Sequence, residues 1–285
     1  MHTRKIGILH PGQMGVAVAT TIRNSGHSIF WASEGRSPET RLRAAEAGLE
    51  DVGSVACICQ TCEVIVSVCP PEFAEPMAHE VAREGFRGLY IDANAIAPER
   101  ARHMGQQLEA AGLRFVDGSI IGLPATSRAQ TWIYLSGTHA EDAAECFTGG
   151  PLEVEVLPGE AGRASALKMC YAAHAKGMAA LRAAVLGAAQ ELGVLDDLER
   201  QWSRSGPPFA QAVASIQHTA PKAWRFVAEM EEIAATLESV GIPGDFHRAA
   251  REIYSRLAPF KGVQKPEFQD ALARLTASKK SSAAD

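Results

Sequence analysis

Short apolar runs that alternate with helical segments constrain the fold of this chain more than any other feature. Apolar and β-branched residues concentrate at residues 5–9, 27–32, 63–68, 88–92 and 113–121. Helical segments lie between these runs. Helical connections of about ten or more residues are typical of parallel strands, because the chain must cross back over the sheet between them. The first half of the chain therefore predicts a doubly wound, mostly parallel α/β sheet.

The second half has a different character. From Gly162 onward the sequence shows no clear strand pattern. Three helical segments are indicated there, at residues 164–193, 220–241 and 245–258. The pattern changes near Pro158, so we expect an α/β domain over residues 1–158 and an all-α domain over residues 159–285.

Composition and charge argue against several classes of function. Of the 285 residues, 46% are hydrophobic and 21% are charged, and the formal net charge is −5. A net negative charge does not favour a nucleic-acid partner. No apolar run reaches the roughly 18 residues that a membrane span needs, and no signal-peptide pattern is found. We therefore expect a cytoplasmic protein without a membrane or nucleic-acid partner.

Three of the six cysteines are close together in the sequence, at Cys57, Cys59 and Cys62. A zinc site usually needs a fourth ligand at a supporting spacing. No further Cys-x-x-Cys pair or close histidine follows the cluster. We interpret these residues as reduced thiols on and near a short helix, and we predict no metal site.

The sequence IGILHPGQMG, at residues 6–15, follows the first apolar run and opens a helical segment. A dinucleotide-binding turn has the spacing Gly-x-Gly-x-x-Gly, and here His10 replaces the first glycine while Gly12 and Gly15 are retained. The retained glycines allow the backbone to approach a pyrophosphate and the helix to pack on the strand. The helix N-terminus attracts phosphate.

This context predicts a Rossmann domain and a nicotinamide cofactor. The predicted cofactor-binding turn comprises His10, Pro11, Gly12, Gln13, Met14 and Gly15. We interpret His10 as a turn residue and not as a catalyst.

The loop after the second apolar run indicates which nicotinamide cofactor binds. NAD enzymes normally place an acid there for the ribose hydroxyls, whereas NADP enzymes use small polar and cationic groups for the 2′-phosphate. Ser33, Arg36 and Ser37 suit the phosphate. NAD(H) stays an alternative, because Glu34, one residue after Ser33, is an acid that can bind the ribose hydroxyls. The loop favours NADP(H) over NAD(H).

The motifs resemble those of the β-hydroxyacid dehydrogenase and 6-phosphogluconate dehydrogenase superfamily, which includes the imine reductases. The resemblance covers nearly the whole chain. The matching motifs are HPGQMG, SVCPP, DANAIAP, VDGSIIG and GRASALKMCYAA, at residues 10–15, 67–71, 92–98, 116–122 and 162–173. Residues 222–241 resemble the subgroup with an uncharacterised C-terminal domain.

The resemblance implies roles for particular residues. Val68, Cys69 and Pro70 correspond to the family's loop over the adenosine and ribose, and Asn94 lies in the segment near the nicotinamide. Lys168 corresponds to the family's catalytic lysine. The implied activity is that of an NADPH-dependent oxidoreductase acting on a small molecule.

The chain also departs from the family pattern. Ile121 stands where the family has a carboxylate-binding serine, although Ser119 lies two residues earlier. Tyr171 and Ala172 replace two asparagines that follow the lysine. The retained Lys168 favours carbonyl–alcohol chemistry, because imine reductases usually have an acid or a tyrosine there. The lost polar groups suggest a substrate other than a simple β-hydroxy acid.

Carbonyl reduction requires a hydride from the nicotinamide and a proton for the developing alkoxide. A lysine beside the substrate can supply this proton and stabilise the charge, if desolvation lowers its pKa. We predict Lys168 as the general acid, with Tyr171, Asn94 and Ser119 as further catalytic candidates. An imine reductase and a catalytically silent NADPH-binding protein are the alternatives.

The helical half predicts an assembly. Long Ala-rich apolar helices are hard to bury in a small domain, so we expect a homodimer that shares the helical domain. Glu229, Glu231 and Glu232 lie on one amphipathic helix. We interpret them as solvated charges, with one acid facing an amine substrate as the alternative.

Overall fold

The computed structural model describes residues 2–125, 127–128 and 130–277. The chain divides after Met169 into two compact units, and this division falls inside a long helix. The domain boundary predicted at residue 158 lies just before that helix, in the loop that follows the last strand.

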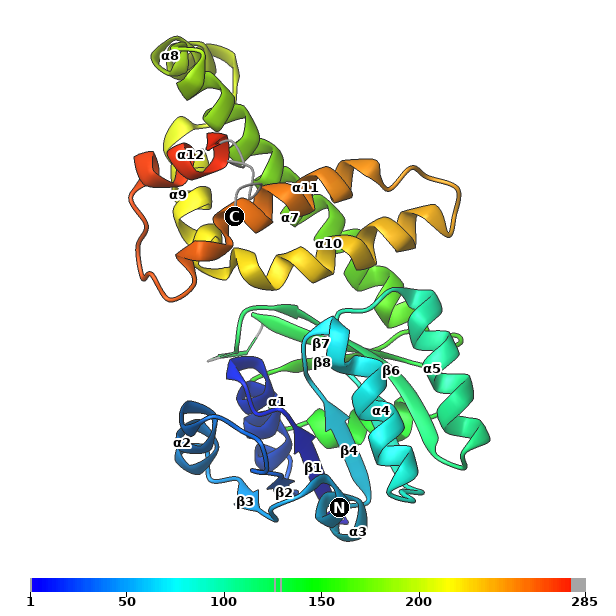
Figure 1. The fold of residues 1–285 in the computed structure, drawn as a ribbon. Coiled ribbons are helices and arrows are strands. Elements are labelled where there is room, and N and C mark those ends of the chain that lie inside the picture. The colour runs from blue at the N-terminus through cyan, green and yellow to red at the C-terminus, as the bar shows by residue number, and fades with distance from the viewer. Residues whose placement is uncertain (1, 126, 129, 278–285) are drawn as a thin grey trace, which may run out of the picture. The chain divides into compact units, whose positions relative to one another are not determined.

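The first unit is built on an eight-stranded sheet (Figure 1). Its strands are β1 Lys5–Leu9, β2 Ser28–Trp31, β3 Glu50–Asp51, β4 Val64–Ser67, β5 Leu89–Asp92, β6 Arg114–Gly122, β7 Thr131–Ser136 and β8 Glu153–Val156. Their order in the sheet is β3-β2-β1-β4-β5-β6-β7-β8, and only β6 and β7 pair antiparallel. The predicted doubly wound, mostly parallel sheet is confirmed. The strands β3, β7 and β8 were not predicted, although the β-branched and aromatic residues of β7 are typical of a strand.

Helices cover both faces of this sheet. They are α1 Gln13–Asn24, α2 Pro38–Glu46, α3 Val55–Thr61, α4 Ala74–Arg83, α5 Pro98–Ala110 and α6 Ala140–Ala144. Val64 and Val66 of β4 pack in the core with α1 and α6, whereas Ile65 packs in the core with α3, α4 and α5. Successive side chains of a strand point to opposite faces, so two covered faces explain the continuous apolar runs.

The described part of the second unit contains helices and connecting loops but no strand. The long helix α7 Arg163–Glu191 leads into it, followed by α8 Leu195–Ser205, α9 Phe209–Thr219, α10 Ala223–Glu238, α11 Asp245–Leu257 and α12 Phe268–Thr276. The expectation of a helical second half is confirmed for these residues, and α8, α9 and α12 add to the predicted helices. None of the described helices has both the length and the apolar character that crossing a bilayer requires.

A buried carboxylate fastens the start of α7 to the sheet. Asp117 ends the parallel part of β6 and is 1% exposed. Its Oδ2 accepts hydrogen bonds from the Ser136 hydroxyl at 2.9 Å and from the Gly162 and Ser165 amides at 2.8 and 3.1 Å. Its Oδ1 accepts one from the Ser165 hydroxyl at 2.5 Å. Burial raises the pKa of Asp117, while these donors favour its charged form.

A second acid lies directly beside Asp117. Asp92 ends β5 and is in register with Asp117 of β6. Burial, and then the neighbouring Asp117 carboxylate, raise the pKa of Asp92 from 3.8 to about 8. Its Oδ1 accepts hydrogen bonds from Asn94, while Oδ2 is buried without a hydrogen-bond partner among the described residues. Asp92 therefore carries a proton at neutral pH.

This proton makes the stability of the first unit depend on pH. Between about pH 4 and the folded-state pKa of about 8, folded Asp92 holds a proton that the unfolded chain has lost. Its contribution to stability is therefore largest at low pH and falls as the pH rises towards 8, with a slope of up to ~1.4 kcal/mol per pH unit. Asp92→Asn should remove this slope, because the amide is neutral at every pH.

The measurement is the free energy of unfolding from urea denaturation at about pH 5, 7 and 9. The difference between Asp92→Asn and the unsubstituted protein should shift in favour of the variant as the pH rises. Asp196→Asn, at an exposed position of α8, is the matched control. A difference that stays constant with pH would contradict the assignment of a protonated Asp92.

Candidate cofactor and active site

The glycine-rich turn lies between β1 and α1, as predicted. His10 adopts a left-handed backbone with φ of 64°, and its carbonyl accepts a 2.7 Å hydrogen bond from the Gly12 amide. His10 thus takes the left-handed turn conformation that usually favours glycine. A Cβ on Gly15 would lie 2.6 Å from the His10 carbonyl oxygen, so this position requires glycine. Gly12 begins α1 without a side-chain cap, which leaves the helix end open to a ligand.

Arg36 lies close to His10 in the first unit. Burial, and then the charge of Arg36, lower the pKa of His10 to about 4, so the imidazole is neutral at physiological pH. Burial also lowers the pKa of Arg36. In the described part of the chain, His10 Nδ1 and Arg36 Nε are buried and lack hydrogen-bond partners. An anionic group bound here would give both atoms a partner.

Helix α2 adds two cations that the sequence analysis missed. Arg43 donates from Nη1 to the Pro11 carbonyl of the turn at 3.5 Å. Arg41 donates from Nη2 to the Ser33 carbonyl at 2.9 Å and from Nε to the Arg36 carbonyl at 3.3 Å. The available signal was the spacing of these arginines shortly after the predicted cofactor loop. The loop is therefore bordered by three guanidinium groups.

The hydroxyl residues of this loop have structural partners. Ser37 caps α2, where its Oγ accepts from the Thr40 amide at 3.3 Å. Ser33 is buried, and its amide donates to Asp51 Oδ1 at 3.2 Å. Glu34, the residue that left NAD(H) open, is exposed.

A cavity of about 150 Å³ lies in the first unit beside the glycine-rich turn. Its lining residues are Met14, Val68, Cys69, Ala93, Asn94, Ala95, Ile120 and Lys168. Five of the predicted site residues therefore come together from four separate segments. Lys168 Nζ donates a hydrogen bond to the Ile120 carbonyl of β6, which holds its ammonium group at the cavity wall.

Asn94 ties the cofactor loop to the sheet. Its Oδ1 accepts from the Cys69 amide at 2.5 Å, and its Nδ2 donates to Ser67 Oγ at 3.1 Å and to Asp92 Oδ1. Asn94 is 3% exposed. These contacts favour a positioning role for the Asn94 amide. Burial raises the pKa of the neighbouring Cys69 thiol to about 12, so this thiol stays protonated.

Two predicted catalytic residues, Ser119 and Tyr171, are not among the lining residues of this cavity. Ser119 is fully buried in β6, and within the described residues its hydroxyl has no hydrogen-bond partner. Tyr171 is 57% exposed and follows Lys168 by three residues on α7. Two of the predicted cofactor-binding residues are exposed, namely Gln13 of the glycine-rich turn and Pro70 of the loop after β4.

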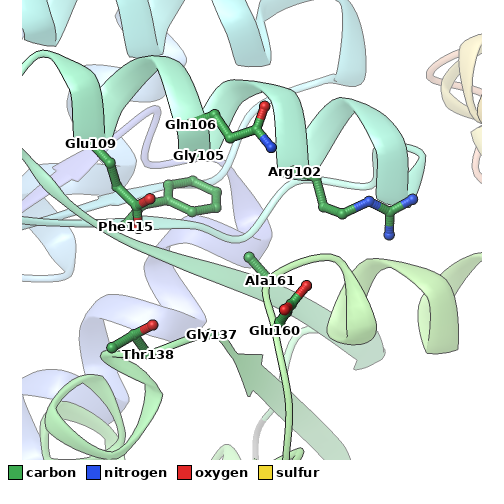
Figure 2. Close-up of a pocket in the computed structure, with 9 residues that line it drawn as sticks. All are labelled: Arg102, Gly105, Gln106, Glu109, Phe115, Gly137, Thr138, Glu160 and Ala161. Atoms are coloured by element: carbon green, nitrogen blue, oxygen red, sulfur yellow. The ribbon is translucent and has the colours of Figure 1, made fainter.

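A larger hollow of about 260 Å³ in the first unit involves none of the predicted site residues. Figure 2 shows that Arg102, Gln106 and Glu109 enter it from α5, while Glu160 and Ala161 come from the loop before α7. The hollow mixes one cation with two acids. Because both signs of charge line the hollow, its side chains do not indicate whether a ligand there is anionic or cationic.

The clustered cysteines pack around α3. Cys62 is buried and belongs to the core between the sheet and α3–α5. Burial raises the pKa of Cys59 and Cys62 to about 12. Over residues 2–125, 127–128 and 130–277, no group of three or more His, Cys, Asp or Glu side chains is placed to hold a metal ion.

Two acids of α10 have cationic partners within the second unit. The interpretation of the acids of this helix as solvated charges is wrong for Glu229 and Glu232, which are buried. Glu229 forms an ion pair with Lys176 of α7. Glu231 pairs with Arg251 at 3.1 Å and with Arg248 at 3.8 Å. These pairs disfavour the alternative in which Glu229 or Glu231 binds an amine substrate.

Comparison with known proteins identifies the family. Residues 5–147 match the NAD binding domain of 6-phosphogluconate dehydrogenase, and residues 189–257 match a domain of unknown function, DUF1932. The 3-hydroxyisobutyrate dehydrogenase of Pseudomonas aeruginosa is 29% identical over 141 residues, which are 48% of this chain and 47% of that protein. An uncharacterised 28.5 kDa protein of Methanothermus fervidus is 26% identical over 58% of this chain and 63% of its own length. The chain thus spans about half to two thirds of these curated relatives.

Solved structures extend the similarity to nearly the whole chain. A conserved protein of unknown function, described as structurally similar to 3-hydroxyacid dehydrogenases, is 28% identical, with a TM-score of 0.66 over 96% of this chain and 100% of that one. Imine reductases and reductive aminases have TM-scores of 0.52 to 0.54 at 15 to 18% identity, which shows the fold alone. The chain belongs to the β-hydroxyacid dehydrogenase and 6-phosphogluconate dehydrogenase superfamily, and its first unit is an NAD-binding domain of that family.

Proposed function

We propose that this chain is an NADP(H)-dependent oxidoreductase that reduces a carbonyl group of a small molecule, or oxidises the corresponding alcohol. The observation that carries the proposal is the position of Lys168. Its ammonium group lines a cavity together with Met14 of the glycine-rich turn and Asn94. A proton donor therefore lies next to the predicted nicotinamide site.

The cofactor fits the residues around the turn. The open N-terminus of α1 suits the pyrophosphate, and Gly12 and Gly15 allow the backbone to approach it. Arg36 suits a 2′-phosphate, supported by Arg41 and Arg43, because guanidinium groups bind phosphate through charge-assisted hydrogen bonds. The bound nicotinamide supplies or accepts the hydride.

The protein itself contributes a proton donor, the ammonium group of Lys168, at a fixed position. The Ile120 carbonyl accepts a hydrogen bond from Lys168 and so orients its ammonium group. The Gly162 and Ser165 amides donate hydrogen bonds to Asp117, and these contacts fix the start of α7. Lys168 lies further along the same helix. In reduction, Lys168 gives a proton to the alkoxide, and in oxidation it takes the proton back.

Two features support a substrate other than a simple β-hydroxy acid. Ile121 replaces the serine that binds a carboxylate in the family, and Ser119 is fully buried. Imine reduction is the alternative activity, and retention of Lys168 argues against it. A second alternative is a protein that binds NADPH but does not catalyse a reaction.

Arg36 should determine the cofactor preference. NADPH should bind more tightly than NADH, and Arg36→Ala should reduce this preference by about 10- to 150-fold, the range expected for a charge-assisted phosphate contact. Titration calorimetry with both cofactors measures the ratio. Arg83→Ala, at an exposed end of α4, is the control. Equal affinities for the two cofactors, or a preference that Arg36→Ala leaves unchanged, would contradict the prediction.

Lys168 should act in the chemical step. Lys168→Met should slow turnover by about 100- to 10,000-fold, because a lost general acid has this effect. NADPH affinity should change little, since the cofactor contacts lie mainly elsewhere in the first unit. The measurement is the oxidation of NADPH over a panel of carbonyls and imines, with melting temperature as the check on folding. The pH–rate profile of the unsubstituted enzyme should show a basic limb that the variant loses.

Lys265→Met, at an exposed position, serves as the control for Lys168→Met. If the folded Lys168→Met protein keeps more than about a tenth of the turnover, Lys168 is not the acid. In that event Tyr171 becomes the leading candidate and imine reduction gains support. NADPH binding without oxidation across the whole panel would favour the silent binding protein.

A homodimer should form through α7. Apolar side chains on this helix remain exposed at Tyr171, Met178, Leu181 and Val185, with fractions of 57%, 38%, 42% and 37%. Their spacing places them along one side of the helix, as in a helix–helix interface. Leu181→Glu together with Val185→Glu should weaken dimerisation at least about tenfold, because two charges would be buried at the interface. Light scattering after gel filtration measures the mass. Leu42→Glu on α2 is the control, and an active monomer at micromolar concentration would disprove the assembly.

A further inference from the structure

Four basic side chains lie close together in the second unit, and two of them contact one indole ring. We call His218, Lys222, Arg225 and Lys261 the basic cluster. Lys222 Nζ lies 3.1 Å from His218 Nε2. Lys261 Nζ lies 4.1 Å from the centre of the Trp224 ring, and the Arg225 guanidinium carbon lies 5.1 Å from it. Cation–π contacts thus attach both side chains to the same indole ring.

The basic cluster has no acidic counterpart. In the portion of the second unit that the structure describes, no carboxylate lies within 4.0 Å of these four groups. Arginines elsewhere in the unit do have such partners: Arg248 pairs with Glu238, and Arg256 pairs with Glu252 at 3.2 Å. The positive charge of the basic cluster is therefore not neutralised by the unit itself, although the whole chain has a net charge of −5.

Two groups of the basic cluster, Lys222 and His218, have lowered pKa values. Burial, and then the charge of Arg225, lower the pKa of Lys222. Burial, and then the charge of Lys222, lower the pKa of His218. Helix α10 also begins at Ala223 with no acidic residue in its first turn. Cations near a helix N-terminus are unfavourable, so an anion at this place would relieve both effects.

We propose that the basic cluster is a binding site for the anionic group of a small molecule, either a phosphate or a carboxylate. The guanidinium of Arg225 offers a planar pair of donors, and the ammonium groups of Lys222 and Lys261 add positive charge. His218 becomes a further donor when it is protonated next to a bound anion. This site is separate from the proposed cofactor phosphate site and does not depend on the oxidoreductase proposal.

Inorganic phosphate and acetate are the probes for the two chemistries, each compared with chloride at the same ionic strength. Binding is measured by calorimetry on the Arg36→Ala protein, in which phosphate binding at the cofactor turn is weakened, and the variants of the basic cluster are made in the same background. Arg225→Ala with Lys261→Ala should weaken binding at least about tenfold, since two charge-assisted contacts are lost. Arg204→Ala, an exposed cation on α8, should change it by less than about twofold. Tighter binding of phosphate or of acetate identifies the class of ligand.

The imidazole of His218 reports on the site itself. Its pKa, measured by nuclear magnetic resonance, should rise when phosphate or acetate binds, because a nearby anion favours the imidazolium form. In the double variant this rise should be absent while the circular dichroism spectrum stays the same. The proposal is overturned if chloride has an equal effect at equal ionic strength. It is also overturned if the anions leave the His218 pKa unchanged, or if the double variant binds them as well as its parent.

Discussion

The candidate active site depends on one buried carboxylate. Asp117 accepts hydrogen bonds from Ser136, Gly162 and Ser165, and these contacts join β6, β7 and the start of α7. An acid with this many donors costs less to bury than an unpaired one, and it fixes the direction in which the helix leaves the sheet. Lys168 lies one turn further along that helix, so its ammonium group is placed by the same contacts.

The charge of Asp117 has a second effect on the neighbouring strand. Asp92 is in register with it, and two adjacent buried carboxyl groups do not both ionise readily. Protonated Asp92 belongs to the network in which Asn94 holds Ser67 and the Cys69 amide. The cofactor loop and the lysine are thus supported by one group of polar side chains at the carboxyl edge of the sheet, where ligands bind in open α/β folds.

The predictions from sequence succeeded where local pattern and tertiary structure agree. The short apolar runs became β1, β2, β4, β5 and β6, because strands covered on both faces need apolar side chains throughout. The two-residue β3 and the charged sequence of β8 carry no such pattern, and pairing with a neighbouring strand defines them. The helices α9 and α12 were missed for a related reason, since each buries apolar residues and packing contributes more to such short helices than local propensity does. Helix α8, which has no buried residue, was also missed.

The sequence by itself determined the strand–helix alternation and the glycine-rich turn, because both are written in residue type and local spacing. The choice of Lys168 came from the resemblance to the family's lysine-bearing helix. The tertiary structure decided which side chains share the cavity. Asn94 proved to be engaged by Ser67, Cys69 and Asp92, and Ser119 proved to be buried. Arg43 reaches Pro11 although 32 residues separate them in the chain. Such contacts depend on strand order and helix direction, which bring distant segments together and which no local spacing encodes.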